Sequence, residues 1–375
     1  MYLSDLTLII LAAGSSTRFN TPVKKQWLRI GMEPLWSFVA NRFEKTGKFS
    51  KIIITGSPDD VSFMHTYTEH QIVCGGNTRQ ESLQYALLHV KTPYVLVTDV
   101  ARACISDAML ERVLDSKGEA DCIVPVLHVS DTITYEAQTV DRSKILRIQT
   151  PQLSRTDVLK NALQTDHEFT DESSAIVANG GSRYFVDGED EAFKLTFAGD
   201  IKELGCLKAP ANVTLVGNGF DVHAFDDKGE MFLCGIKIES DFGFLAHSDG
   251  DVAIHALIDA LLGAAGMGDI GMLFPDNDDT YKGIDSAILL KEVIKKLNNF
   301  GYGIVNVDIT IIAQTPRIGK YKDAMRKNIA QILGIAPFCV NIKATTTEKL
   351  GFIGRKEGVG VLASASLNYY NWTNK

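Results

Sequence analysis

Short, continuous apolar runs alternate with segments of helical period along the first 210 residues. Four of these runs are Leu6–Leu11, Lys51–Thr55, Tyr94–Thr98 and Asp121–Val126. Strands that lack polar alternation are buried on both faces, which is typical of a parallel sheet covered by helices. The pattern therefore predicts an N-terminal α/β domain of Rossmann-like type with a mostly parallel sheet.

The pattern changes after residue 210. One later segment alternates apolar and polar residues, and we expect one of its faces to be buried, formed by Val305, Val307, Ile309 and Ile311. Two helical stripes of apolar residues end at Gly301 and Gly334. Because a chain of 375 residues exceeds a single ordinary core, we expect two domains, residues 1–210 and 211–375, with a short connector near 208–212. The second domain is predicted to be α+β, with a sheet packed against helices.

Composition excludes several classes of protein. The chain is 45% hydrophobic and 22% charged, as in ordinary globular proteins. Its formal net charge of −8 leaves no basic surplus for nucleic acid or an anionic membrane surface. No apolar run approaches the roughly 18 residues of a membrane helix. The six cysteines are scattered without a CxxC pair, which indicates a reducing compartment, the cytoplasm.

A loop of small residues, Leu11–Arg18, follows the first predicted strand. It matches neither the dinucleotide fingerprint nor the Walker A loop, yet its backbone N–H groups would suit a phosphate. A second such loop, Gly75–Arg79, carries a cation, and Arg18, Lys24 and Lys25 lie near the first loop. With Asp99 at the end of a strand as a ligand for Mg²⁺, these residues would suit a nucleoside triphosphate. The alternative is that each loop is only a turn.

Residues 6–205 resemble 2-C-methyl-D-erythritol 4-phosphate cytidylyltransferase, because they contain the motifs of that family in the same order. They are Leu11–Arg18, Lys25-Gln26, Gly75–Arg79 with Ser82, Asp99 with Ala101-Arg102, Asp131-Thr132, Asp141-Arg142, Thr150-Pro151-Gln152 and Thr170-Asp171-Glu172. The sequence departs from the family's pattern in three places. Ser16 replaces a usual glycine, Lys24 replaces a proline, and the loop at 98–103 matches the family's acidic loop less closely.

The resemblance implies a role for each matching residue. Arg18 and Lys25 would stabilise charge on the phosphates of CTP, and Asp99 would contact ribose or Mg²⁺, which Mn²⁺ may replace. The cytidine pocket would be formed by Ala12, Ala13, Gly14, Gly76, Asn77 and Ser82. Methylerythritol phosphate would be held by Arg102, Thr132, Arg142, Thr170 and Lys194. For Arg142 and Lys194, the alternative from the residues alone is solvated surface charge.

Histidines of the second half gather beside aspartates, which is typical of metal sites. Asp221 and His223 share a face if extended, and His255 lies on a helix expected to begin near Asp249. Three protein ligands leave a fourth position open for substrate, as in catalytic zinc sites. Asp251, four residues before His255, could orient that histidine instead of binding metal. Satisfied polar histidines are the alternative.

The second half resembles 2-C-methyl-D-erythritol 2,4-cyclodiphosphate synthase over nearly all of 213–375. The matching segments are Gly219–His223, Ala246–Val252, Gly268–Gly271 with Phe274-Pro275-Asp276, and Ala344–Gly354. The resemblance implies zinc on Asp221, His223 and His255, Mg²⁺ on Glu348, a substrate phosphate near His247 and ribose at Asp269. Substrate would also meet Asp276, the backbone of Ala313–Gly319, and the phosphate-binding Thr346 and Arg355.

Together these resemblances imply two non-consecutive steps of non-mevalonate isoprenoid synthesis. CTP and 2-C-methyl-D-erythritol 4-phosphate would give 4-diphosphocytidyl-2-C-methyl-D-erythritol and pyrophosphate. After a separate kinase, a transient partner, the 2-phosphate of that product would cyclise with loss of CMP. The cyclase domain is expected to be a homotrimer, helped by a small-residue helix, 253–266, at the threefold axis, and the transferase domain to make dimeric contacts. Alternatives are a nucleotide-sugar nucleotidyltransferase fused to a zinc phosphohydrolase, or to a zinc-stabilised oligomerisation module.

Overall fold

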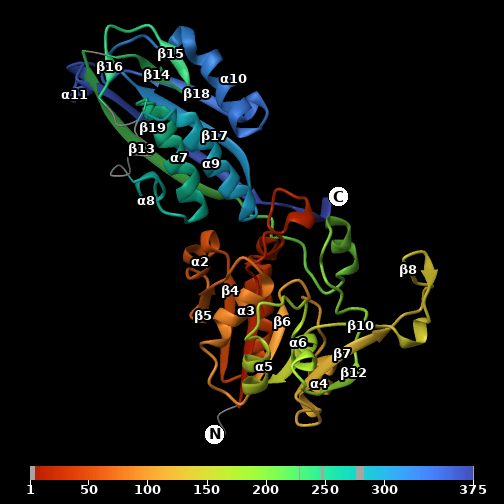
Figure 1. Cartoon of the computed structure of the whole chain (residues 1–375). Helices are drawn as coiled ribbons and strands as arrows, with labels where there is room; N and C mark the ends of the chain where they lie inside the picture. The colour runs from red at the N-terminus through yellow and green to blue at the C-terminus, as the bar shows by residue number, and fades with distance from the viewer. Residues whose placement is uncertain (1–4, 228, 246–248, 276–282, 375) are drawn as a thin grey trace. The chain divides into compact units, whose positions relative to one another are not determined.

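The computed structural model describes residues 5–227, 229–245, 249–275 and 283–374. It divides the chain into two compact units (Figure 1), the first reaching Pro210 and also containing the residues from Trp372 onward. The second unit is Ala211–Asn371. The predicted domain 211–375 is therefore wrong for its last residues. Trp372 is buried, and its indole N–H donates to the carbonyl of Arg29 at 2.7 Å, which ties this end of the chain to the first unit.

The sheet of the first unit contains eight strands among the described residues, seven of them in the order β10-β7-β11-β6-β1-β4-β5, with β12 beside β7. Their bounds are β1 (Leu6–Leu11), β4 (Lys51–Gly56), β5 (Gln71–Cys74), β6 (Tyr94–Asp99), β7 (Cys122–His128), β10 (Leu146–Ile148), β11 (Gln152–Arg155) and β12 (Arg183–Asp187). Strands β1, β4, β5 and β6 pair with one another in parallel, and β12 pairs in parallel with β7. The antiparallel pairs are those of β10 with β7 and of β11 with β6 and β7. The predicted mostly parallel sheet is confirmed.

Helices cover both faces of this sheet. They are α1 (Leu35–Lys45), α2 (Pro58–Met64), α3 (Arg79–Leu87), α4 (Asp107–Asp115), α5 (Thr156–Ala162) and α6 (Glu172–Ala178). Ile9, Val97 and Val124 form one core with residues of α3, α5 and α6. Their strand neighbours Leu8 and Leu96 point to the opposite face and are also fully buried. Both faces are therefore dry, which explains the continuous apolar runs in the sequence.

An arm lies between β7 and β10. It carries the short hairpin β8 (Thr134–Tyr135) and β9 (Gln138–Thr139), whose residues are all exposed. Figure 1 shows β8, in yellow, projecting away from the sheet. A second small hairpin, β2 (Arg29–Ile30) and β3 (Glu33–Pro34), precedes α1.

The second unit is a five-stranded sheet, among the described residues, in the order β16-β13-β19-β17-β18. The strands are β13 (Leu215–Asp226), β16 (Gly243–Phe244), β17 (Tyr302–Ile312), β18 (Val340–Thr345) and β19 (Gly358–Tyr369), beside the hairpin β14 (Met231–Leu233) and β15 (Ile236–Ile238). The helices are α7 (Val252–Ala265), α8 (Ile270–Leu273), α9 (Ser286–Asn299), α10 (Lys322–Leu333) and α11 (Gly351–Gly354). The α+β prediction is confirmed, and α10 ends at Gly334 in the left-handed conformation.

Helix α7 packs directly onto β13 through small residues. A Cβ atom at Gly217 or Gly219 would collide with the backbone of Ala260, so only glycine lets the helix approach so closely. The small-residue helix expected to line a threefold axis is thus used within its own chain, and its Ala256 and Ala260 are buried there.

One other prediction fails for a local reason. Val305 is 39% exposed, not buried, because the pairing of β17 with β19 shifts between Ile304 and Asn306 and turns this side chain outward. Cys104 and Cys206 form a disulfide, although the scattered cysteines indicate a reducing compartment. The two are 102 residues apart, and their spacing gives no sign that the loop after β6 meets the end of the first unit.

Candidate active sites

The first candidate site lies where the strand order of the first unit reverses. From β1 the chain continues to β4 and β5 on one side, then crosses to β6 on the other, so β1 and β6 border the switch point. Leu11 pairs with both Asp99 and Thr55, which brings the carboxyl ends of three strands to one edge. Ligands of open α/β sheets bind in this crevice.

Two loops of small residues meet at this edge. A Cβ atom at Gly75 would collide with the Cβ of Ala13, so glycine is needed for the loops to touch. The Ala12 N–H donates to Thr55 Oγ1 at 3.1 Å, and the Gly76 N–H donates to Ser82 Oγ at 3.1 Å. The structure therefore brings the predicted residues of both loops together, with Gly14 and Asn77 in the same segments.

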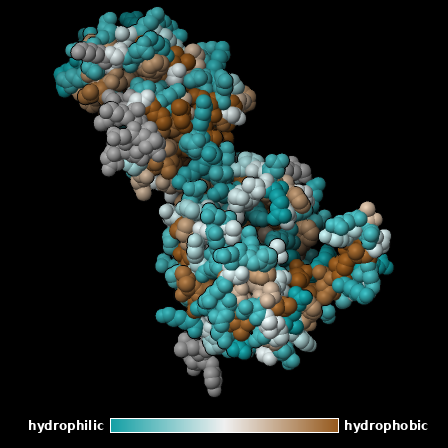
Figure 2. Space-filling view, viewed as in Figure 1, coloured by the Kyte–Doolittle hydropathy of each residue, from teal (hydrophilic) through white to brown (hydrophobic). Residues whose placement is uncertain are grey.

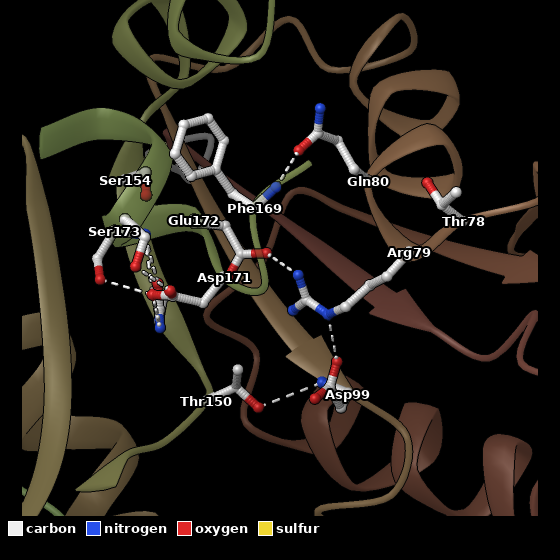
Figure 3. A network of polar contacts seen from close by, with 12 residues as sticks. Thr78, Arg79, Gln80, Asp99, Thr150, Ser154, Phe169, Asp171, Glu172 and Ser173 are labelled. Carbon is white, nitrogen blue, oxygen red and sulfur yellow. Dashed lines mark hydrogen bonds and ion pairs between the residues drawn. The ribbon is translucent and has the colours of Figure 1, made fainter. Parts of the chain in front are cut away.

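Asp99 belongs to a network of charged residues at this edge, and Figure 3 shows the part that links it through Arg79 to Glu172. Arg79 Nε donates to Asp99 Oδ1 at 3.1 Å, and another guanidinium nitrogen donates to Glu172 Oε1 at 2.7 Å. Lys194 Nζ donates to Asp99 Oδ2 at 2.6 Å. Burial alone would raise the pKa of Asp99, but the charges of Arg79 and Lys194 outweigh it and hold that pKa well below its usual range.

Glu172 completes this network from the first turn of α6. Its side chain is fully buried, and burial raises its pKa although Arg79 opposes the shift. Asp171 caps the helix by accepting from the N–H and hydroxyl of Ser173, as Figure 3 shows. From the sequence, Glu172 is only part of a motif, and Arg79 is a candidate cation for phosphates. Arg79 is paired with the carboxylates of Asp99 and Glu172, and its contact with phosphates stays a prediction.

Lys25 lies near Asp99 and Lys194 of this network. Its ammonium donates to the carbonyl of Leu195 at 3.4 Å. Burial lowers its pKa, and the neighbouring charges of Lys194 and Arg18 lower it further, against Asp99. Arg18 is exposed beside the loop. Arg102 donates to the carbonyls of Ala192 at 2.6 Å and Ile148 at 3.4 Å, which holds the segment that carries Lys194.

Three predicted site residues are not part of this network. Thr132 and Arg142 lie on the exposed arm, where Arg142 donates to the carbonyl of Ser130. Thr170 is exposed two residues before Glu172. Lys24, expected among the phosphate-binding cations, is instead paired with the buried carboxylate of Asp60 at 2.8 Å.

The second candidate site is a cluster of metal ligands. Asp221 and His223 on β13 and His255 on α7 offer ligand atoms that all lie within 4.8 Å of one another. Asp221 Oδ2 is 3.3 Å from His223 Nε2 and 3.4 Å from His255 Nδ1. Burial would raise the pKa of Asp221, but hydrogen bonds from both histidines hold it well below its usual range. One carboxylate and two imidazoles are a donor set that suits zinc.

The outward nitrogens of both imidazoles are braced by other groups. His223 Nδ1 lies 2.9 Å from the carbonyl of Gly250, and His255 Nε2 lies 3.0 Å from Ser286 Oγ, which donates to Asp249. Such partners fix the ring orientation of a ligating histidine. Ser286 had no signal in the sequence beyond its place at the start of a helix.

The orienting role considered for Asp251 is wrong. Its carboxylate caps α7 by accepting from the N–H groups of Ala253 and Ile254, and it also accepts from Cys234 and Gly235. The expected role requires Asp251 to lie within the helix, one turn before His255. It lies instead at the N-cap of α7, where its side chain accepts from the free N–H groups of the first turn.

The remaining predicted residues of the second unit lie elsewhere on it. Asp269 caps α8 and is exposed. Thr346 Oγ1 donates to Glu348 Oε1 at 2.8 Å, and the Ala313 N–H donates to the carbonyl of Thr345 at 3.0 Å, so the loops after β17 and β18 lie side by side. Arg355 pairs with Glu357 and Gly319 begins a 3₁₀ helix. His247 and Asp276 lie outside the described residues.

Comparison with known proteins assigns a family to both units. The family model described as 2-C-methyl-D-erythritol 4-phosphate cytidylyltransferase matches residues 6–205, and that of the YgbB family matches residues 214–368. The bifunctional enzyme IspD/IspF of Sulfurimonas denitrificans is 64% identical over 99% of this chain and 96% of its own. The chain belongs to the bifunctional IspD/IspF family. The corresponding enzyme of a Sulfurovum species is 57% identical over 99% of this chain and 100% of its own.

A solved structure agrees with this assignment. The bifunctional IspDF from Campylobacter jejuni is 47% identical, covers 99% of this chain and 100% of its own, and superposes with a TM-score of 0.93. As an IspD/IspF enzyme, the chain has cytidylyltransferase and cyclodiphosphate synthase activities of isoprenoid biosynthesis. Among the described residues, no helix is both long and apolar enough to cross a membrane.

Proposed function

We propose that CTP binds in the crevice at the carboxyl ends of β1 and β6. The touching loops at Ala13 and Gly75 support a place for cytidine there, and Arg18 and Lys25 border the same crevice. Asp99 faces it from β6 and would contact ribose or Mg²⁺. The observation that supports this site most is the pairing of Leu11 with both Asp99 and Thr55, because it brings these loops to the switch point of the sheet.

In the transferase reaction the phosphate of methylerythritol phosphate attacks the α-phosphorus of CTP, and pyrophosphate leaves. Lys25 and Arg18 stabilise the negative charge that builds on the phosphates. Arg102 and Lys194 hold the attacking phosphate, since both are anchored beside Asp99. The attacking oxygen is already a competent nucleophile, so alignment and charge stabilisation supply the rate.

Thr132 and Arg142 complete this site in a second copy of the chain. Both lie on the projecting arm, apart from the Asp99 network of their own chain. Figure 2 shows hydrophobic side chains at the base of the arm, where Leu146 and Ile148 are only partly buried. An arm of this kind can cross to a neighbour in a symmetric dimer.

The cyclase reaction uses the cluster of Asp221, His223 and His255. These residues would hold zinc, and Glu348 would hold Mg²⁺ or Mn²⁺; bound there, the metals would polarise phosphate oxygens. Ser286 and Gly250 keep the two imidazoles turned toward Asp221. Thr346 and Arg355 steady phosphate oxygens while the 2-phosphate attacks the β-phosphorus and CMP leaves.

Each cyclase site is shared by two subunits of a homotrimer. Within one chain, β13 and β18 are separated by β19 and β17, so their ends lie about 14 Å apart across three strand spacings. The metal ligands on β13 and the loop with Thr346 and Glu348 after β18 are therefore three strands apart in the same sheet. An exposed apolar face, with Val216, Phe220 and Leu362, supports burial against other copies.

Subunit mixing tests the shared site. His255→Ala removes the metal side, and Gly319→Trp blocks the cytidine side, where a new side chain meets open space. Each variant alone is expected to be inactive as a cyclase. After dissociation and random reassociation, about a quarter of the interfaces should pair two intact sides, and activity should return. Exchange of subunits without any return of activity would show that each site is built within one chain.

A further inference from the structure

A single buried amide joins the predicted phosphate loop to the turn that carries Lys25. Gln26 is 1% exposed. Its Nε2 donates to the carbonyl of Gly14 at 3.0 Å, and its Oε1 accepts from Ser16 Oγ at 2.9 Å. The same Ser16 oxygen accepts from the backbone N–H of Lys25 at 3.1 Å. The loop and the turn are thus held by three hydrogen bonds that meet at two side chains.

Gln26 also contacts a buried ion pair, formed by Lys24 and Asp60. Asp60, in the first turn of α2, is fully buried, and its carboxylate accepts from Gln26 Nε2 at 3.3 Å. Lys24 Nζ donates to the other carboxylate oxygen at 2.8 Å and also to Ser57 Oγ at 3.4 Å. A buried carboxylate needs such a cation, because an unpaired charge away from water is strongly disfavoured.

The backbone at Ser16 and Lys24 suits the glycine and the proline that the family resemblance leads us to expect there. Ser16 has φ 59° and ψ 23°, the left-handed conformation that glycine adopts most readily. Lys24 has φ −64°, the angle to which proline is restricted. The chain path is therefore the one that glycine and proline would favour, while the side chains present add hydrogen bonds and an ion pair that those two residues lack.

We infer that Ser16, Lys24, Gln26 and Asp60, here called the Gln26 clamp, are positioning residues for cytidylyl transfer. The clamp keeps the Gly14–Arg18 loop and Lys25 in one arrangement, so that the ammonium meets the phosphates where charge builds. This inference rests on the proposed role of Lys25. None of the four side chains needs to touch CTP.

Loss of the clamp has a distinct kinetic consequence. A displaced ammonium stabilises the transition state less, whereas cytidine and ribose still bind to the other loops. The kcat for transfer is therefore expected to fall by roughly 10- to 100-fold, with a much smaller change in the KM for CTP. A purely structural role would lower the fraction of folded enzyme and leave kcat per folded molecule unchanged.

The experiment compares Ser16→Gly, Gln26→Leu and Lys24→Pro in the full chain. Transfer is followed by pyrophosphate release, thermal unfolding reports the folded fraction, and cyclisation by the same chain is the internal control. Ser16→Gly is the sharpest variant, because glycine accepts the backbone angle and only the hydroxyl is lost. It should lower kcat for transfer while cyclisation and the unfolding temperature stay nearly constant.

A pair of rescue variants tests the ion pair. Lys24→Pro leaves Asp60 buried without its cation, so it should lower kcat and stability together. Adding Asp60→Asn removes the unpaired charge and keeps an acceptor for Gln26, so the double variant should regain most of both. Lys24→Arg, which keeps the cation, should stay near the wild-type kcat.

Two results would overturn the inference, and they differ from failure of the proposed site. Unchanged kcat in Ser16→Gly and Gln26→Leu, with Lys25→Ala inactive in transfer, would show that Lys25 needs no clamp. A double variant no better than Lys24→Pro would show that the pair does not support Gln26. Normal transfer by Lys25→Ala would instead refute the role of Lys25, and the clamp would lose its purpose with it.

Discussion

Arg79 shows how single residues in this enzyme serve the site through contacts with other side chains. It lies between Asp99 and Glu172, and the two contacts hold a carboxylate at the end of β6 and another at the start of α6. Glu172 Oε2 is buried without a hydrogen-bond partner among the described residues. Removing the cation would leave the buried Glu172 without its ion pair, while Asp99 would keep only Lys194, and breaking a buried pair in this way typically costs about 3–5 kcal/mol. The network therefore explains why Asp99 stays ionised at the edge of a dry core.

The lowered pKa of Lys25 predicts how transfer depends on pH. Lys25 must be protonated to stabilise phosphates, and burial with Lys194 and Arg18 lowers its pKa from 10.5, against the opposing charge of Asp99. Activity should therefore decline as pH rises, at a pH below that of an ordinary lysine. The measurement is kcat/KM for CTP against pH, which reports the free enzyme.

Lys25→Arg provides the control for this prediction, because a guanidinium stays charged throughout the range. Its alkaline decline should shift upward or disappear, even if its rate is lower. A wild-type decline that persists unchanged in Lys25→Arg would assign the titration to another group.

Residues whose partners are near in sequence were predictable from spacing, whereas distant partners either followed from the resemblance to known families or had no signal. Asp221 and His223 are two apart on a strand, so their shared face follows from strand geometry. Glu172 meets Arg79 across 93 positions, Gln26 meets Asp60 across 34, and His255 meets Ser286 across 31. Only the folded chain brings these pairs together, and sequence spacing carries no trace of them.

At the scale of elements, long apolar patterns predicted strands and helices well, and local irregularities did not follow the pattern. The runs at Leu6–Leu11 and Lys51–Thr55 are strands within one residue of their expected ends. The strand at 302–312 contains a bulge, which turned Val305 outward. Bulges depend on pairing with a neighbour, β19 in this case, so alternation along one strand cannot reveal them.

A residue at the start of α9 is expected to affect how tightly the site on β13 and α7 binds metal. Ser286 is the first residue of α9 and braces His255 Nε2. Ser286→Ala should weaken zinc binding by roughly 10- to 100-fold, because an unbraced ring loses its orientation. This affinity is measured directly by letting a chelator compete with the protein for zinc, with no other metal and no substrate present.

A matched control for this prediction is Ser364→Ala on β19, whose hydroxyl bonds Asn218 and not a metal ligand. Its zinc affinity should equal that of the wild type. Equal affinities in both variants would mean that the hydroxyl of Ser286 does not hold His255 for metal.

At the scale of the whole molecule, two cores with separate sites share one chain. The change of pattern after residue 210 was visible in the sequence, but the return of the last residues to the first unit was not. A few residues after a strand carry no periodic signal, and their docking depends on a surface more than 340 positions away, at Arg29.

Trp372 predicts an asymmetry between the two units. Its indole is buried in the first unit, so Trp372→Ala should destabilise that unit by about 3–5 kcal/mol and leave the second unaffected. Denaturant unfolding, followed by the loss of each activity separately, checks this. A fragment 1–210 should share the defect, whereas a fragment 211–371 should keep its fold. Equal transferase stability in wild type and Trp372→Ala would contradict the docking.

Two separate sites in one chain are the central claim, and crossed substitutions test it most directly. Phosphorus NMR follows both reactions in wild type, Lys25→Ala and Asp221→Ala, with each substrate supplied independently. Lys25→Ala should lose cytidylyl transfer and keep cyclisation, and Asp221→Ala should show the reverse. Loss of both reactions in either folded variant, or full transfer by Lys25→Ala, would contradict the account.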